Sequence, residues 1–188
     1  MKICHHKTVM TAIKSKFFAA ILAIIFCLTT SALAQPNTPP PEITLSDLET
    51  VNIAIISKEK MTLTLYNAKG EIHAQYPIAT GKNVGQKLQR GDMKTPEGFF
   101  VISQIQNSSL WEYDFGDGKG AIKGAYGPWF IRLHTPGHIG IGIHGTHDEK
   151  SIGTRVSEGC IRMKNADLSD FVKKIKVGDF VMILADLD

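Results

Sequence analysis

The chain has 188 residues, with 21 Lys and Arg against 18 Asp and Glu, which gives a formal net charge of +3. Four of the basic residues lie within residues 1–34, which contain no acidic residue, and they are Lys2, Lys7, Lys14 and Lys16. The other 154 of the 188 residues carry 17 basic and 18 acidic side chains, a net charge of −1. This balance gives no reason to expect nucleic acid as a partner. The length suits one domain with a hydrophobic core.

The amino-terminal segment has the pattern of a secretory signal peptide. Its basic residues precede an apolar run over residues 17–28, and Ala32-Leu33-Ala34 forms a small-x-small cleavage signature. The alternative is an uncleaved membrane anchor, because residues 17–34 have about enough apolar length to cross a bilayer. We expect residues 1–34 to be a signal peptide, residues 35–50 to be a proline-rich linker, and the protein to be exported to the periplasm or cell envelope.

Residues 51–188 predict one mainly β domain (α+β). Apolar residues alternate with polar ones over residues 62–66, turn residues follow at 67–70, and a second strand-like run covers 72–79. Two strand-like runs joined by a short turn are typical of a hairpin. Residues 91–98 contain Thr-Pro and two glycines and predict a loop.

The second half of the domain combines further strands with one convincing helix. Apolar patterning predicts strands over residues 99–105, 129–134, 138–144 and 180–184. The polar, glycine-rich stretch at 106–127 is too long for a tight turn. The helix is predicted to begin near Asn165, a possible N-cap, and to continue through Ile175 at helical spacing.

The predicted strand at residues 138–144 ends in His144. Its period of two places two glycines and His144 on one face, and the other face carries Ile139, Ile141 and Ile143. Glycines on a strand face allow a ligand or a neighbouring backbone to come close. The glycines alone do not distinguish an open face from a tightly packed one.

Cys160 is the only cysteine beyond residue 34, because Cys4 and Cys27 lie in the leader. A single cysteine in a secreted domain indicates an intermolecular bridge or a reactive thiol, and the alternative is a buried, inert residue. Gly159 permits a turn that aims backbone N–H groups at an oxyanion, and the cation of Arg162 lowers the pKa of a nearby thiol. We therefore predict that Cys160 is a nucleophile.

His144 is the candidate general base. It ends a predicted strand sixteen residues before Cys160, and a loop of that size can bring the two side chains within hydrogen-bond reach. The alternative is a histidine that is satisfied in the core or at the surface. The lone thiol favours the catalytic interpretation.

Two motifs surround these residues and a third lies upstream. They are Ile143-His144-Gly145-Thr146, Ser157-x-Gly159-Cys160-Ile161-Arg162-Met163 and Gly91-Asp92-x-Lys94-Thr95-Pro96-Glu97-Gly98-x-Phe100. Together with their spacing, they resemble the L,D-transpeptidase catalytic domain family (YkuD-type) over nearly all of residues 51–186. No single motif would suffice for this assignment.

The resemblance implies a β-sandwich-like domain with one or two short helices, and an enzyme of cell wall remodelling and cell shape. In such an enzyme, Cys160 attacks a peptidoglycan tetrapeptide stem, D-Ala leaves, and an amine of a second stem resolves the thioester into a 3→3 cross-link. Stem peptides would then be both donor and acceptor, and carbapenems would form an adduct with Cys160. We expect a monomer that needs neither a cofactor nor a metal.

The resemblance also assigns roles to individual residues. His144 would be the base, and the Gly145 carbonyl would orient its ring. Backbone N–H groups around Gly159 and Cys160 would form the oxyanion hole. The remaining candidates for the oxyanion or substrate site are Arg162, Thr146 and Ser157. For Arg162, a salt bridge within the loop is an equally good interpretation.

One position departs from the family pattern, because many members have His where this chain has Glu158. A carboxylate that pointed inward would raise the pKa of a nearby thiol. We therefore expect Glu158 to face outward or to pair with Arg155 or Arg162.

Other classes of function stay open. Zinc could in principle be bound by His134, His138, His144, His147 and Cys160, although Pro136-Gly137 breaks the helix that the first spacing usually needs. A non-catalytic wall-binding module would need neither the thiol nor the base. Within the enzyme class, water as acceptor would make an L,D-carboxypeptidase, and a protein lysine would anchor a lipoprotein.

Overall fold

The computed structural model describes residues 51–186 except Asp117 and Lys119. The predicted signal peptide and linker, residues 1–50, lie outside the described residues. Within the described part of the chain, no helix combines the length and the apolar character needed to cross a membrane.

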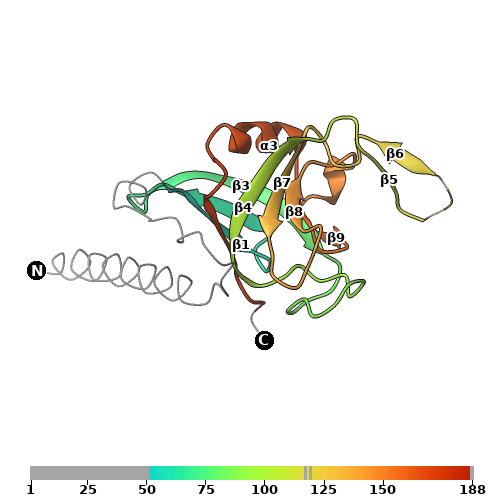
Figure 1. Ribbon diagram of the computed structural model, residues 1–188, viewed down its shortest axis with the longest axis horizontal. Coiled ribbons are helices and arrows are strands. Elements are labelled where there is room, and N and C mark those ends of the chain that lie inside the picture. Colours follow the sequence, from blue (N-terminus) through green and yellow to red (C-terminus); the bar gives the residue numbers. More distant parts are fainter. Residues whose placement is uncertain (1–50, 117, 119, 187–188) are drawn as a thin grey trace, which may run out of the picture. The chain divides into compact units, whose positions relative to one another are not determined.

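Nine strands form one sheet, in the spatial order β10-β8-β7-β4-β11-β1-β2-β3-β9 (Figure 1). Their bounds are β1 Ile53–Ser57, β2 Thr62–Tyr66, β3 Ile72–Gly81, β4 Gly98–Asn107, β7 Trp129–His134, β8 Gly142–His144, β9 Arg155–Ser157, β10 Ile161–Met163 and β11 Phe180–Ile183. Because β10 also pairs with β3, the sheet closes on itself and is barrel-like. The mainly β prediction is confirmed, whereas the sandwich-like arrangement is not.

The helical content of the described residues is small. It comprises the helix α3, Asn165–Val172, and the 3₁₀ turn η1, Glu149–Ser151. The predicted helix is confirmed, but it ends at Val172 and does not continue through Ile175. Lys164, and not Asn165, occupies the N-cap position and makes no side-chain hydrogen bond there. Leu168 and Phe171, three positions apart, are fully buried under the helix.

Local patterning accounts for the strands that the sequence predicts well. β2 and β3 pair in antiparallel fashion, as expected for the predicted hairpin. Every second side chain of β1 and β2 points inward and is at most 1% exposed. These side chains are Ala54, Ile56, Leu63 and Leu65. The last strand, β11, is sandwiched between β1 and β4.

The strand predicted at residues 138–144 is wrong in its first half. Only residues 142–144 form a strand, because Gly137 and Gly140 both adopt a φ of +80° and turn the chain. Ile139 is therefore 90% exposed, while Ile141 and Ile143 are buried. The three isoleucines do not share one face.

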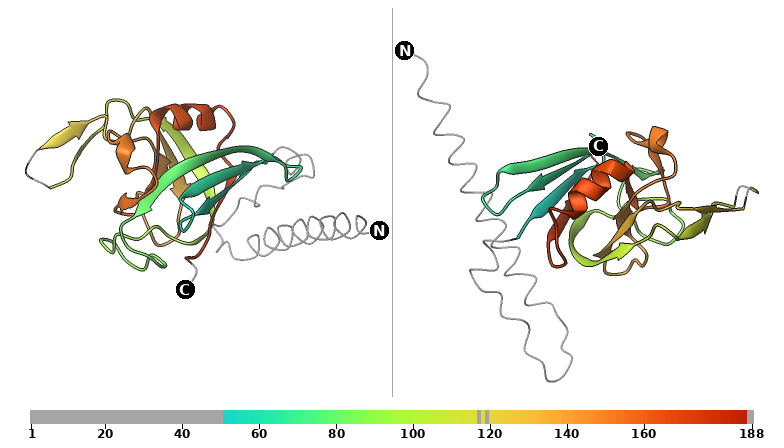
Figure 2. Two further views of the ribbon diagram at one scale, coloured as in Figure 1. Left: turned by 180° about the vertical axis from the view of Figure 1, so that it is seen from behind. Right: turned by 90° about the horizontal axis from the view of Figure 1, so that it is seen from above.

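The glycine-rich stretch at 106–127 contains a second, two-stranded sheet. β5, Glu112–Asp114, pairs with β6, Ala121–Lys123, and this hairpin projects from the main sheet in all views (Figures 1 and 2). The buried Ser108 closes its base by donating from Oγ to the Gly127 carbonyl oxygen at 2.9 Å. The hairpin is thus anchored next to β7.

Candidate active site

A cleft of about 810 Å³ lies between the β5–β6 hairpin, the strands β7, β8 and β10, and the loop that follows β3. Cys160 and His144 both line it. They come together because β8 and β10 are parallel neighbours, with Arg162 paired to His144 and Ile161 to Ile143. The two side chains that the sequence singled out therefore face one space.

The imidazole of His144 is held by aromatic rings and one carbonyl. Its ring stacks on Phe130 at 5.5 Å between centroids and meets Tyr126 edge-on at 4.9 Å. Nδ1 lies 2.7 Å from the carbonyl oxygen of Gly145. A carbonyl oxygen only accepts, so Nδ1 carries the proton and Nε2 is left as an acceptor.

The same packing keeps His144 neutral. Burial lowers its pKa to about 3, and Arg162 acts in the same direction, while the bond to Gly145 opposes them. The side chain is 4% exposed. At neutral pH the imidazole is uncharged, as a general base must be.

Gly142 shows why this face of β8 lacks side chains. A Cβ there would lie 2.5 Å from Cε1 of Phe130 and 2.6 Å from the Ile131 carbonyl oxygen. At Gly140, in contrast, a Cβ would meet nothing within 4 Å. The face is thus tightly packed at Gly142 and open at Gly140.

The thiol of Cys160 is also neutral at rest. Sγ hydrogen-bonds to the Gly140 carbonyl oxygen at 3.3 Å, and the described residues include no hydrogen bond between Sγ and His144. Burial raises the thiol pKa, against the opposing effects of a backbone hydrogen bond from Gly142 and of Arg162, Arg132 and Lys87. The electrostatics favour a thiol beside an imidazole rather than an ion pair.

The turn before Cys160 is closed by Ser157. Its Oγ donates to the Cys160 carbonyl oxygen at 2.5 Å and accepts from the Gly159 N–H at 3.1 Å. Ser157 lines the cleft, but the Gly159 N–H is already used, contrary to its expected place in an oxyanion hole. The N–H of Cys160 itself remains the candidate donor.

Gly159 is required by its surroundings. Its φ is +140°, and a Cβ would lie 2.8 Å from the Lys94 carbonyl oxygen. Lys94 belongs to the upstream motif, which thus packs directly against the turn before Cys160.

Thr146 is not among the described residues that line the cleft, and its role at the substrate site stays a prediction. It is 1% exposed, and its backbone N–H and carbonyl are bound by Oδ1 and Nδ2 of Asn165, each at 3.0 Å. Asn165 also packs so closely on Gly145 that a Cβ there would lie 2.2 Å from Oδ1. The sequence indicated Asn165 only as a helix cap. In the structure, the Asn165 side chain binds the backbone of the loop that carries the Gly145 carbonyl.

Arg162 lines the cleft under the hairpin. Its guanidinium carbon lies 5.5 Å from the centre of the Phe115 ring. Among the described residues it makes no ion pair, and its buried Nε has no hydrogen-bond partner. The described residues therefore do not include the salt bridge that was the alternative interpretation of Arg162.

Lys87 is a cleft residue that the sequence reasoning missed. It is 6% exposed, and its Nζ binds Asp92 Oδ1 at 2.7 Å. Asp92 also accepts from the backbone N–H groups of Leu88, Gln89 and Lys94. Asp92 of the Gly-Asp motif thus stabilises the loop that carries Lys87. The sequence signal that could have indicated this contact was an aspartate five residues after the lysine.

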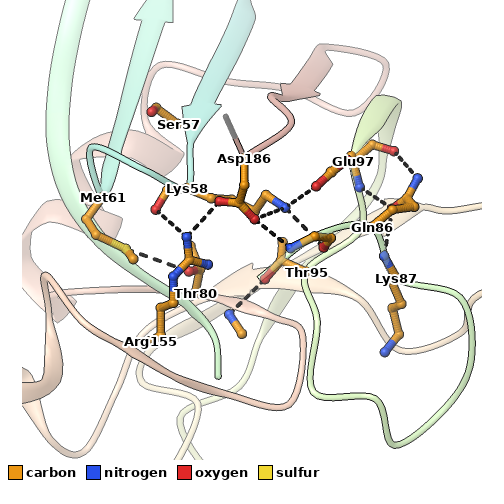
Figure 3. Close-up of polar contacts among 12 residues, drawn as sticks. Ser57, Lys58, Met61, Thr80, Gln86, Lys87, Thr95, Glu97, Arg155 and Asp186 are labelled. Atoms are coloured by element: carbon orange, nitrogen blue, oxygen red, sulfur yellow. Dashed lines mark hydrogen bonds and ion pairs between the residues drawn. The ribbon is translucent and has the colours of Figure 1, made fainter. Parts of the chain in front are cut away.

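A buried ionic network supports the same loop (Figure 3). Lys58, 1% exposed, binds Glu97 Oε1 at 2.5 Å and Asp186 Oδ2 at 2.9 Å. Asp186 in turn binds Arg155 at 2.7 Å and accepts from the Gly85 N–H at 2.7 Å. The motif residue Glu97 therefore has a structural role.

Glu158 pairs with neither of the expected arginines. Its exposed side chain lines the cleft and accepts a hydrogen bond from the Tyr113 hydroxyl at 3.1 Å. Arg155 binds Asp186 instead. Within the described part of the chain, no group of three or more His, Cys, Asp or Glu side chains is arranged to hold a metal ion.

The closed β sheet and its cysteine-histidine cleft define a domain class that comparison with known proteins identifies. Residues 51–183 match the family model of the L,D-transpeptidase catalytic domain, YkuD, and the chain belongs to this family. A transpeptidase transfers an acyl group, so membership indicates an acyltransferase.

Individual relatives agree with this assignment. The chain is 31% identical over 152 residues to YkuD of Bacillus subtilis, which carries the name of an L,D-transpeptidase, covering 80% of this chain and 70% of the relative. It is 33% identical over 118 residues to YqjB of the same organism, covering 62% of each. The helical cell shape determining protein Pgp2 of Campylobacter jejuni has a TM-score of 0.54 at 26% identity, covering 73% of this chain and 49% of that one. The chain thus spans between 49% and 70% of the length of these proteins.

Proposed function

We propose that this protein is an exported, cysteine-dependent L,D-transpeptidase that acts on peptidoglycan stem peptides in the cell envelope. The observation that carries the proposal is the joint position of Cys160 and His144 in one cleft of a family-matched domain. The leader supports export, and residues 51–188 would form the catalytic domain.

In the first half-reaction, Cys160 Sγ bonds to the acyl carbon at the L-centre of the donor stem. His144 Nε2 accepts the thiol proton as the C–S bond forms, because the resting thiol and imidazole are both neutral. The C–N bond to D-Ala then breaks, and the imidazolium returns its proton to the leaving amine. The products are the thioester and free D-Ala.

The oxyanion that forms between these events needs nearby donors or positive charge. The Cys160 N–H is the proposed donor, and Lys87, Arg132 and Arg162 line the same cleft. Gly145 is proposed to orient His144 through its carbonyl, and Ser157 and Gly159 to hold the nucleophile turn.

In the second half-reaction, a primary amine of another stem attacks the thioester carbon. The balance is R–CO–S–Cys + R′–NH₃⁺ → R–CO–NH–R′ + HS–Cys + H⁺, with the released proton passing to solvent. The result is a 3→3 cross-link when the amine belongs to the third residue of the acceptor stem.

Two measurements test the proposal. Intact-protein mass spectrometry after incubation with a carbapenem should show a covalent adduct on the wild type and none on Cys160→Ala. An adduct that persists in that variant removes Cys160 as nucleophile. Incubation with purified tetrapeptide muropeptides should give cross-linked dimers. Tripeptides alone would indicate hydrolysis, and unchanged substrate would refute the proposed enzymatic activity.

A further inference from the structure

The charges that line the cleft are strongly unequal. Among the described residues that line it, Lys87, Arg90, Arg132 and Arg162 are basic, with Lys87 paired to Asp92, whereas Glu158 is the one acidic side chain. A cation that enters this space is repelled by most of the wall and attracted at one point. That point lies two residues before the nucleophile in the sequence.

The Glu158 side chain accepts a hydrogen bond from the β5–β6 hairpin. The Tyr113 hydroxyl, on strand β5, donates to Oε2 at 3.1 Å, and Oε1 makes no hydrogen bond among the described residues. Burial and this bond to Glu158 both raise the pKa of Tyr113, so its hydroxyl stays protonated and remains a donor at neutral pH. One carboxylate oxygen is thus oriented by Tyr113 and the other is free to accept.

We propose that Glu158, oriented by Tyr113, binds the protonated primary amine of the acceptor stem. This inference rests on the proposed function and names the part of that site that selects an amine over water. A primary amine with an ordinary pKa of about 10.4 reaches the enzyme as an ammonium ion. Carboxylates of the stems are attracted to the four basic side chains, which leaves Glu158 as the matching partner for the ammonium group.

The position of Glu158 suits the second half-reaction. Both Glu158 and Cys160 line the cleft, and they flank Gly159 on a turn whose backbone is hydrogen-bonded to Ser157 Oγ. The bound ammonium must release one proton to solvent before its nitrogen attacks the thioester carbon. Binding therefore raises the local amine concentration, while hydrolysis by water gains nothing from Glu158.

A purely structural contact between Tyr113 and Glu158 makes different predictions. Glu158→Gln removes the charge but keeps an oxygen that accepts from Tyr113, whereas Tyr113→Phe removes the hydrogen bond but keeps the charge. If Glu158 binds ammonium, Glu158→Gln is the more harmful change. If the contact only holds the hairpin down, Tyr113→Phe is the more harmful change.

The experiment uses a tetrapeptide muropeptide as donor with increasing concentrations of a tripeptide muropeptide as amine acceptor. At subsaturating acceptor, Glu158→Gln should lower the ratio of dimer to hydrolysed tripeptide about fivefold, the effect of an exposed ion pair, and Tyr113→Phe about twofold. The rate of thioester formation, followed by mass spectrometry, should stay within about twofold of wild type in both variants. Glu112→Gln, an exposed glutamate on the same hairpin outside the cleft lining, is the matched control and should leave the ratio unchanged.

Each other outcome overturns the inference. An unchanged ratio in Glu158→Gln would show that the carboxylate does not bind the acceptor. An equal loss in thioester formation would place its effect on the donor or the thiol. The reverse order of the two variants would make the contact structural. Wild-type protein that forms no thioester would refute the proposed function itself, and this amine site with it.

Discussion

The buried ammonium group of Lys58 offers the sharpest test of how this domain is held together. Replacing Lys58 with Met keeps a side chain of similar length but removes the charge between Glu97 and Asp186 (Figure 3). Lys58 Nζ also donates to the Gly85 carbonyl oxygen at 3.2 Å. The change therefore withdraws one cation from two carboxylates and one carbonyl at once.

The expected loss follows from what the other partners retain. Removing one member of a buried ion pair costs about 3 to 5 kcal/mol, because the remaining charge is uncompensated. Asp186 keeps Arg155 and the Gly85 N–H, whereas Glu97, 18% exposed, loses its cation. We therefore expect the lower end, about 3 kcal/mol of the free energy of unfolding, or a fall in Tm of about 10 °C.

Urea unfolding at pH 7, followed by far-UV circular dichroism, measures this loss. Lys60→Met, an exposed lysine two residues along the chain, is the control and should change the free energy of unfolding by less than about 0.5 kcal/mol. Adding Glu97→Gln to Lys58→Met should recover part of the loss, because it neutralises the unpaired carboxylate. A loss below about 1 kcal/mol for Lys58→Met, or no recovery in the double variant, would refute the reasoning.

Three further predictions concern acidity and positioning. Burial raises the pKa of Asp186, but the Gly85 N–H and the cations of Lys58 and Arg155 together lower it to about 2, below its ordinary value of 3.8. The contribution of this carboxylate to the free energy of unfolding is complete above about pH 4 and is lost as the pH falls toward 2. In Asp186→Asn, the midpoint of urea unfolding should therefore change less with pH over that range. Because burial raises the thiol pKa, alkylation of Cys160 by iodoacetamide should still accelerate above pH 9, and a plateau at or below pH 7 would contradict this. Asn165→Ala should leave the buried backbone groups of Thr146 unpaired, which lowers the free energy of unfolding by about 2 kcal/mol and also lowers the rate constant of acylation. Asn165→Asp keeps an oxygen that accepts from the Thr146 N–H, so it should recover part of the stability and part of the acylation rate.

Sequence patterns predicted the elements whose contacts are local. The β2–β3 hairpin is formed by neighbouring segments, and α3 shows its apolar spacing within eight residues. The closure of the sheet by β10 and β3 joins residues about eighty positions apart, and no local pattern reports such a pairing. The barrel-like form was therefore beyond reach.

The chemistry of the site was predictable where one residue type has few uses. The lone thiol of Cys160 suggested a partner base, and His144 at a strand end was the candidate. Both side chains line the cleft. The direction of hydrogen bonds was not predictable: the Gly159 N–H binds Ser157, and Glu158 meets Tyr113 from a hairpin far away in sequence. Nor does a sequence show that a lysine such as Lys58 is buried, because lysine is ordinarily exposed and its partners come from two distant segments, the loop between β3 and β4 and the residue Asp186.

Because Cys160 and His144 are both neutral at rest, we propose that the cations lining the cleft act on the transition state rather than on the resting thiol. Burial opposes ionisation of both Cys160 and His144, and the cations near Cys160 lower its pKa by less than burial raises it. In the proposed reaction, the proton would therefore move as the C–S bond forms, when negative charge passes from sulfur to the carbonyl oxygen. Arg162 lines the cleft and has a buried Nε without a hydrogen-bond partner, and we propose that it stabilises that charge. Arg162→Ala should slow acylation by a donor stem at least about tenfold, the effect of one lost charged donor, while iodoacetamide alkylation of Cys160, which forms no oxyanion, slows far less. Equal losses in the two reactions would assign Arg162 to ionisation of the thiol instead.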